Sequence, residues 1–279
     1  MAPTNTIIHQ TIRELKTGFA GSIAPLTIVD VHIGMHLSAI ELSDGSCGVA
    51  GTAENSGAHA PERRERDFGA FTPNQIRGQN VLALLESEKA SPVVDTLKIA
   101  VLNAISSALL ASSSHKIVED KDPVDLLDLG NSKSVALVGA FRSYMKKIAD
   151  AGAGIRLQVL EFKKEALPEE FQQHYVPAAD YQRVLPASDV VIITGLTLVN
   201  GTIDGLLSSI RPGAEVVVTG PSANIIPDVL FDNGVTMIGA TRITDRDMLF
   251  STVGEGGSGY HLFRYCARKI TIVKGQNNG

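Results

Sequence analysis

The feature that most constrains the fold is a regular alternation of short apolar runs and helix-forming segments in the second half of the chain. The apolar runs lie at 134–139, 156–162, 190–194, 215–219 and 235–239. Strands that alternate with helices form βαβ units, which require a parallel sheet and right-handed crossovers. We therefore predict an α/β fold with helices over 143–151, 181–185, 203–210, 224–231 and 245–253, and a helix or strand within 260–273.

The first half has a different period. Residues 26–33 and 36–42 alternate between apolar and polar side chains, and Asp44-Gly45 is a strong signal for a hairpin turn. A third strand over 46–52 completes an antiparallel meander. Helices are predicted on either side of it, over 6–17, 72–86 and 92–110. The first half is therefore a small α+β module.

Two polar stretches lie outside the predicted helices and strands, one within the first half and one between the halves. Residues 53–71 form a long loop without helical or strand periodicity, and loops of this length are commonly functional. We predict that this loop closes over a ligand as a lid. The polar connector 112–130 places the boundary near Lys121. The predicted organisation is thus an α+β domain at 1–120 and a parallel-sheet domain at 121–279.

Composition excludes several classes of partner. The 279 residues carry 25 Lys and Arg against 30 Asp and Glu, a net charge of −5 without a basic stripe, so we expect no nucleic-acid partner. No apolar run approaches the ~20 residues of a membrane span.

The only cysteines, Cys47 and Cys266, form no disulfide framework, and the N-terminus lacks the pattern of a signal peptide. A cytoplasmic protein is predicted, and a homo-oligomer is compatible with the sequence.

Small and hydroxyl side chains follow two consecutive predicted strands, 190–194 and 215–219. Carboxyl ends of parallel strands meet at one edge of a sheet, where ligands bind beside helix N-termini. The predicted ligand-binding residues are Thr194, Thr197, Asn200, Thr202, Gly220, Pro221, Ser222 and Asp245. Helix capping is the alternative: Asn200 or Thr202 for the helix at 203–210, Ser222 for the next, and Asp245 for the helix that follows it.

The turn after the first parallel strand argues against a dinucleotide. Gly139-Ala140-Phe141-Arg142-Ser143 has one glycine where G-x-G-x-x-G is expected, and bulky side chains occupy the place of the pyrophosphate. Glu161, at the end of the second strand, matches the position of a ribose-binding acid, but one acid is weak evidence and a surface carboxylate is the favoured interpretation. NAD(P) is therefore disfavoured, and S-adenosylmethionine, which uses a similar topology, is no better supported.

The candidate metal ligands are His32, His36 and Glu54. The two histidines lie four residues apart around a strand and bend and could share a face, and Glu54 lies in the polar loop. Imidazole and carboxylate groups are transition-metal ligands. None of these residues has the spacing of a known metal motif, so ordinary side chains of a sheet and a loop remain the alternative.

Several segments resemble a known family. ITGLTLVNGT (193–202), TGPSANIIPDVLFDNGV (219–235) and GATRITD (239–245) resemble the putative heavy-metal chelation family of unknown function, and 29–53 looks like its meander. The resemblance implies an enolase N-terminal-like domain followed by a Rossmann-like domain, with a candidate active site between them. The residues that match its motifs are Thr194, Asn200, Thr202, Gly220, Pro221, Ser222 and Asp245.

The resemblance implies binding of a metal or metal chelate in a cleft between two domains, linked to heavy-metal or corrinoid cofactor metabolism. Two alternatives stay open. One is an enzyme, a lyase or transferase acting on a small anionic substrate without a bound metal. The other is a non-catalytic binding or scaffold protein in which the polar clusters are helix caps. Enolase chemistry does not follow, because the barrel with its magnesium carboxylates is absent.

Overall fold

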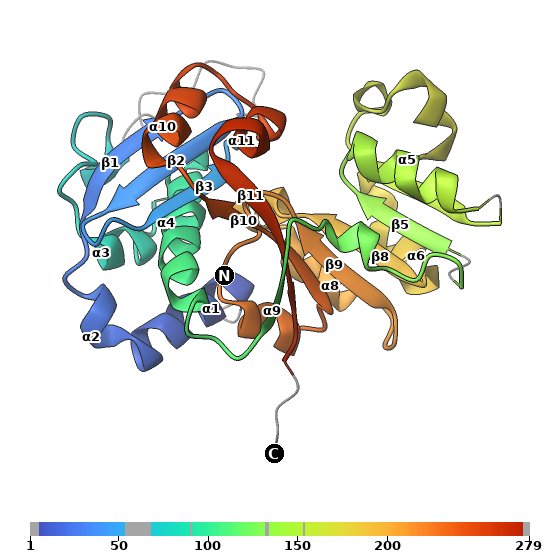
Figure 1. Cartoon of the computed structure of the whole chain (residues 1–279), viewed down its shortest axis with the longest axis horizontal. Coiled ribbons are helices and arrows are strands. Elements are labelled where there is room, and N and C mark those ends of the chain that lie inside the picture. The colour runs from blue at the N-terminus through green and yellow to red at the C-terminus, as the bar shows by residue number, and fades with distance from the viewer. Residues whose placement is uncertain (1–5, 54–67, 90, 132–133, 153, 276–279) are drawn as a thin grey trace.

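The protein folds around two β-sheets (Figure 1). The computed structural model describes residues 6–53, 68–89, 91–131, 134–152 and 154–275. A three-stranded antiparallel sheet contains β1 (Ile28–Ile33), β2 (Leu37–Leu42) and β3 (Cys47–Gly51). An eight-stranded sheet has the order β4-β11-β10-β9-β8-β5-β6-β7. The predicted α/β class and the meander are thus confirmed.

Helices cover both faces of the three-stranded sheet. Alternate residues of the strands point to α4 (Pro92–Leu110) on one face. The residues between them pack against α10 (Arg246–Gly254) and α11 (Gly259–Tyr265), which come from the far end of the chain (Figure 1). Helix α4 is long and apolar enough to cross a membrane, but 67% of its apolar stretch is buried inside the fold. It therefore serves as the core helix of this half.

The predicted helix at 72–86 is mostly wrong. Asn74 and Gly78 have φ of 71° and 84°, left-handed values that an α-helix does not contain. Helix α3 (Val81–Leu85) therefore begins only after Asn80, whose side-chain oxygen accepts hydrogen bonds from the amides of Leu82 and Ala83. The predicted first helix is confirmed as α1 (Ile7–Gly18), capped by Thr6, and a short α2 (Ala20–Ile23) follows it.

Six strands of the large sheet are parallel. They are β5 (Ser134–Val138), β6 (Arg156–Glu161), β7 (Tyr175–Pro177), β8 (Val190–Thr194), β9 (Glu215–Thr219) and β10 (Met237–Ile243). In chain order their positions read 3-2-1-4-5-6, the order of doubly wound folds. Successive strands are therefore added on one side of β5 up to β7, and on its other side from β8 onward. The point between β5 and β8 is the place where such folds bind ligands.

Helices cover both faces of the parallel strands. Val135 and Leu137 of β5 face α5 (Arg142–Ala151), and the residues that alternate with them face the opposite layer. The opposite layer consists of α6 (Tyr181–Val184), α7 (Leu196–Val199), α8 (Ile203–Ser208) and α9 (Pro227–Asp232). Strands buried on both faces explain why this half reads as continuous apolar runs.

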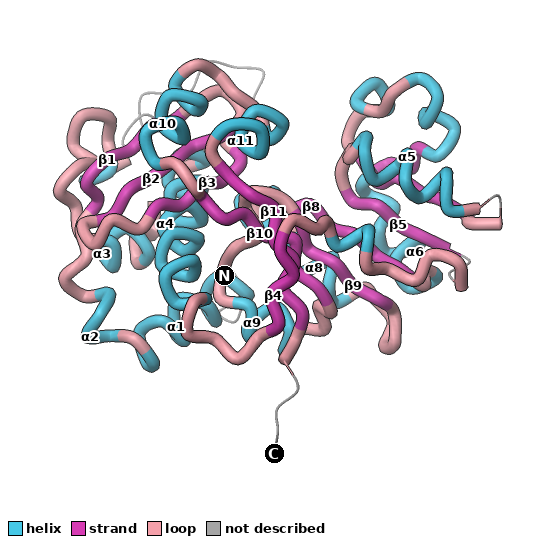
Figure 2. Tube along the Cα trace, in the orientation of Figure 1, coloured by secondary structure: helices cyan, strands magenta, loops and turns pink. Residues whose placement is uncertain are grey.

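Two antiparallel strands extend the large sheet at one edge. β11 (Ala267–Val273) pairs with β10, and β4 (Lys116–Glu119) pairs with β11 (Figure 2). The predicted connector 112–130 therefore contains a strand, β4, and the prediction of a connector without a strand is wrong. Four residues are too few to display a clear period of two, so β4 is defined by its partner rather than by its own sequence.

The two halves share one apolar core. A single cluster of buried side chains contains Leu97 of α4 together with Val218 of β9 and Ile238 of β10. Polar contacts join the halves as well: the Asn103 side-chain amide donates to the carbonyl oxygens of Val49 (2.8 Å) and Pro221 (3.0 Å). The division into two domains at Lys121 stays a prediction.

Candidate functional site

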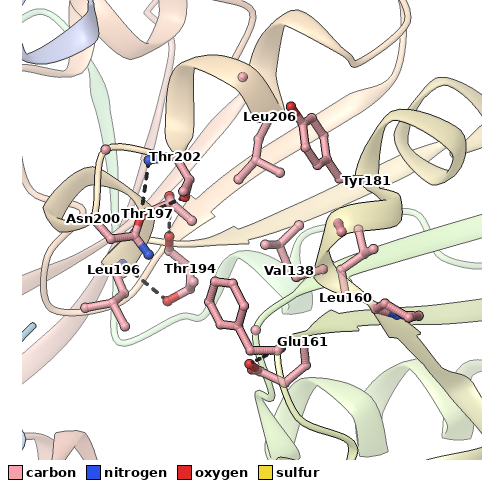
Figure 3. A pocket seen from close by; sticks show the side chains of 17 residues that line it. Val138, Leu160, Glu161, Tyr181, Thr194, Leu196, Thr197, Asn200, Thr202 and Leu206 are labelled. Atoms are coloured by element: carbon pink, nitrogen blue, oxygen red, sulfur yellow. Dashed lines mark hydrogen bonds between the residues drawn. The ribbon is translucent and has the colours of Figure 1, made fainter. Parts of the chain in front are cut away.

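Four of the predicted ligand-binding residues line one cavity at the point where the sheet order reverses. Thr194, Thr197, Asn200 and Thr202 form one side of a space of about 640 Å³ at the carboxyl ends of β5, β6, β7 and β8. Figure 3 shows these polar side chains on one side, with Val138, Leu160 and Leu206 on the other. We call this space the switch-point cavity.

The polar side of the switch-point cavity is held by its own hydrogen bonds. Thr197 Oγ1 donates to the Thr194 carbonyl at 2.7 Å, and Thr202 Oγ1 donates to Asn200 Oδ1 at 2.7 Å. Thr202 precedes α8, yet its side chain accepts no capping hydrogen bond from that helix. The turn therefore fixes these side chains, while Asn200 Nδ2 makes no hydrogen bond with any residue that the structure describes.

Ser222 forms a hydrogen bond between the two halves of the chain. Its side chain is only 2% exposed, and its hydroxyl oxygen accepts a hydrogen bond from the Gly51 amide of β3 at 2.8 Å. The capping alternative is therefore wrong for Ser222, because α9 begins at Pro227 and is preceded by Ile226 without a side-chain cap. The serine lies at the interface rather than on the wall of the cavities that contain the other predicted residues.

Gly220 and Pro221 line a second cavity, of about 520 Å³, beside a partly buried polar network. The Tyr144 hydroxyl donates to Asp122 Oδ1 at 3.1 Å and lies 3.3 Å from Thr219 Oγ1, and Lys269 Nζ donates to Asp122 Oδ2 at 2.6 Å. Burial, followed by the charge of Asp122, raises the pKa of Tyr144 strongly, so the phenol stays neutral. Sequence reasoning missed this network because its members are spread from residue 122 to residue 269.

Asp245 lines a third cavity, of about 770 Å³, between the two halves. The hairpin that carries Asp44 and Cys47, together with the C-terminal end of α4, forms one wall, and Thr241, Asp245 and Arg246 belong to the other. We call this space the inter-sheet cavity. Asp245 Oδ1 also accepts from the Met248 amide at 2.9 Å, so this residue caps α10 as well as lining the cavity. The capping expectation is confirmed, and ligand binding by Asp245 stays a prediction.

Two groups in the inter-sheet cavity lack strong partners. Thr241 is 2% exposed, and its hydroxyl has no hydrogen-bond partner among the described residues. A buried hydroxyl without a partner is costly, and the described residues contain three more of them, at Ser91, Ser106 and Ser113. Cys47 Sγ makes one weak contact, 3.7 Å to the Gly45 carbonyl, and burial, with help from Glu41, raises the pKa of this thiol to about 11.

Two of the three predicted metal ligands, His32 and His36, lie within the described residues. His32 Nδ1 lies 3.1 Å from the Phe250 carbonyl oxygen, and its ring packs edge-on against Phe250, which ties β1 to α10. His36 is exposed in the turn between β1 and β2. Glu54, and with it residues 54–67 of the predicted lid, lies outside the described residues. Within the described residues, no group of three or more His, Cys, Asp or Glu side chains could hold a metal ion.

Residues 122–272, more than half of the chain, match a family model described as putative heavy-metal chelation, and residues 18–106 match a second model of the same description. An uncharacterized protein of Methanocaldococcus jannaschii is 26% identical over 178 residues, which are 63% of this chain and 65% of that protein. The chain thus covers less than two thirds of that relative.

Two crystal structures of proteins with unknown function, both from the family of the first model, share this fold. The one from Pyrococcus horikoshii has a TM-score of 0.74 at 18% identity, over 96% of this chain and 98% of its own. The one from Desulfitobacterium hafniense DCB-2 has a TM-score of 0.71 at 20% identity, over 95% and 100%. These likenesses confirm the α/β fold.

Proposed function

We propose, because the chain belongs to the putative heavy-metal chelation family, that it binds a heavy-metal ion already complexed by a small organic chelator. The inter-sheet cavity is the site we assign. The observation that carries this choice is the presence of one thiol, Cys47, and two carboxylates, Asp44 and Asp245, around a polar cavity with walls from both halves of the chain. The metal complex is cargo in this proposal. The family description supports a role in heavy-metal metabolism, and a role in corrinoid cofactor metabolism is proposed from the sequence resemblance alone.

The donor groups favour a complex over a bare ion. A protein site for a bare transition metal commonly supplies three or four side-chain ligands, and the described residues contain no such group. The inter-sheet cavity does contain one thiol, Cys47, and two carboxylates, Asp44 and Asp245. Thiolates select soft metals. A chelator that supplies most of the ligands therefore needs one further bond from the protein, and Cys47 provides it.

The size of the cavity also fits a complex. Its volume of about 770 Å³ lies within the range of about 300–1,000 Å³ that is typical of small-molecule sites. The carboxylates of Asp44 and Asp245 line the same space and are close enough to contact polar groups of the chelator. The bond between Cys47 and the metal displaces the thiol proton, since the ligand is the thiolate.

The test compares a cadmium–nitrilotriacetate complex, free Cd²⁺ and nitrilotriacetate alone in calorimetric titrations of the purified protein. We expect the complex to bind more tightly than either component. Cys47→Ser should weaken binding of the complex at least about tenfold, because one metal–thiolate bond is lost. Cys266→Ala is the matched control, since that cysteine is 1% exposed and does not line the inter-sheet cavity. Equal affinity for free Cd²⁺ and the complex, or an unchanged Cys47→Ser variant, contradicts the proposal.

One observation favours the enzyme alternative. The second cavity combines the neutral Tyr144 hydroxyl with the cations Lys269 and Arg264, a combination suited to a small anionic substrate. If a substrate binds there, Arg264→Ala should lower the affinity of the protein for it, and Cys47→Ser should leave that affinity unchanged. The metal complex is expected to give the reverse pattern.

A further inference from the structure

The switch-point cavity is separate from the inter-sheet cavity and plays no part in the proposed function. It is formed by the carboxyl ends of four adjacent parallel strands, and its lining comes from residues 138–206 alone. Most of the predicted polar residues face it. Its chemistry therefore points to a second ligand, independent of the metal complex.

One side of the cavity suits a flat apolar ring. Val138, Leu160 and Leu206 face it from β5, β6 and α8, and Tyr181 from α6 stands beside them (Figure 3). Phe162 also lines the cavity and is 75% exposed. An exposed aromatic ring at the edge of an apolar slot is a stacking surface for a planar heterocycle.

A single carboxylate lines the cavity beside this slot. Glu161 Oε1 accepts a hydrogen bond from the Phe162 amide at 2.7 Å, and the carboxylate forms no salt bridge with any described residue. It lies at the end of the second parallel strand, 22 residues after Gly139. In doubly wound folds an acid at this place binds the hydroxyl groups of a ribose. The free oxygen of Glu161 can accept from such a pair of hydroxyls.

The charge of the cavity disfavours a phosphate group beside Glu161. Its lining residues include no Lys, Arg or His, and Glu161 is the one acid among them. A phosphate group would face this carboxylate without a compensating cation. On the polar side, the Asn200 Nδ2 group has no protein acceptor among the described residues and can donate to a ring nitrogen or carbonyl of a base.

We propose that the switch-point cavity binds a ribonucleoside group without a phosphate next to it. The base lies in the apolar slot against Phe162, and the ribose hydroxyls donate to Glu161. The absent glycine fingerprint agrees with this ligand, since no pyrophosphate has to approach the turn after β5. A nucleoside, or a larger ligand that ends in one, is the chemical class that matches all of these groups.

The first test is a set of calorimetric titrations with adenosine, 2′,3′-dideoxyadenosine and adenosine monophosphate, repeated with guanosine, cytidine and uridine. We expect at least one ribonucleoside to bind, its dideoxy analogue to bind at least about tenfold more weakly through the lost charge-assisted hydrogen bonds, and its monophosphate to bind more weakly as well. No binding of any nucleoside at millimolar concentration, or a preference for the monophosphate, overturns the proposal.

Two variants locate the site. Glu161→Gln should remove the preference for the ribose over the dideoxyribose, and Glu169→Gln, an exposed acid outside the cavity, should leave it intact. Phe162→Ala should weaken binding about tenfold through lost stacking and leave the melting temperature unchanged, because the ring is exposed. Unchanged discrimination in Glu161→Gln overturns the assignment. Cadmium–nitrilotriacetate binding should be unaffected in both variants, so the two proposals fail separately.

Discussion

At the scale of single residues, small polar side chains at strand ends have roles that depend on partners far away in the chain. Ser222 and Asp245 look alike in the sequence, as candidate caps or ligand contacts. Asp245 finds a cap partner three residues later, at Met248, whereas Ser222 binds Gly51, 171 residues earlier. A local pattern can identify the first partner. It cannot identify the second, which exists only once the two halves have packed.

Ser222→Ala should destabilise the protein, because the substitution leaves the Gly51 amide without its acceptor at the interface of the two halves. We expect the free energy of unfolding, measured by urea titration, to fall by about 1–3 kcal/mol. Ser251→Ala is the control, since that serine is exposed on α10 and should change the free energy by less than about 0.5 kcal/mol. Equal stability of the two variants would show that the hydrogen bond to Gly51 contributes nothing.

At the scale of elements, strongly periodic segments are predictable and short or interrupted ones are not. The strands β5, β6, β8 and β9 lie where the apolar runs place them, because each is buried on both faces. β4 has no periodicity of its own, and α3 is shortened by left-handed backbone at Asn74 and Gly78. Helix α4 begins where Ser91-Pro92 predicts it and ends near the predicted Leu110, because a long apolar stretch continues to that point.

The contact between α4 and β3 gives a prediction at this scale. A Cβ atom at Gly48 would lie 2.0 Å from the Ala100 carbonyl oxygen of α4, so Gly48→Ala must push the helix off the sheet. We expect the free energy of unfolding to fall by about 3 kcal/mol, at the upper end of overpacking costs. Gly21→Ala in α2, where a Cβ meets no atom within 4 Å, is the control and should not destabilise the fold. A Gly48→Ala variant as stable as the wild type would refute this close packing.

At the scale of the whole molecule, the fold class follows from the sequence, whereas the way the halves combine does not. Strand and helix alternation predicts the parallel sheet, and the hairpin signal predicts the meander. The sequence gives no sign that α10 and α11 leave the large sheet to cover the meander, or that one apolar core joins both halves. The predicted polar residues accordingly separate, since four line the switch-point cavity and Asp245 lines the inter-sheet cavity.

The shared core predicts cooperative unfolding. Because buried side chains of α4 and of the large sheet belong to one cluster, the two halves should lose their structure together. Urea unfolding followed by circular dichroism and by hydrogen exchange at amides of β2 and β8 should give coincident midpoints. Separate midpoints for the two sheets would instead support two independently folding domains with a boundary near Lys121.

The central claim is that a metal complex binds in the inter-sheet cavity, and anomalous diffraction from a crystal soaked in cadmium–nitrilotriacetate tests it most directly. The proposal predicts that the strongest cadmium peak lies within bonding distance of Cys47 Sγ, with the chelator extending towards Thr241 and Asp245. The peak should be absent from crystals of Cys47→Ser. A strongest peak in the switch-point cavity or on the outer surface, with none beside Cys47, would contradict the proposal.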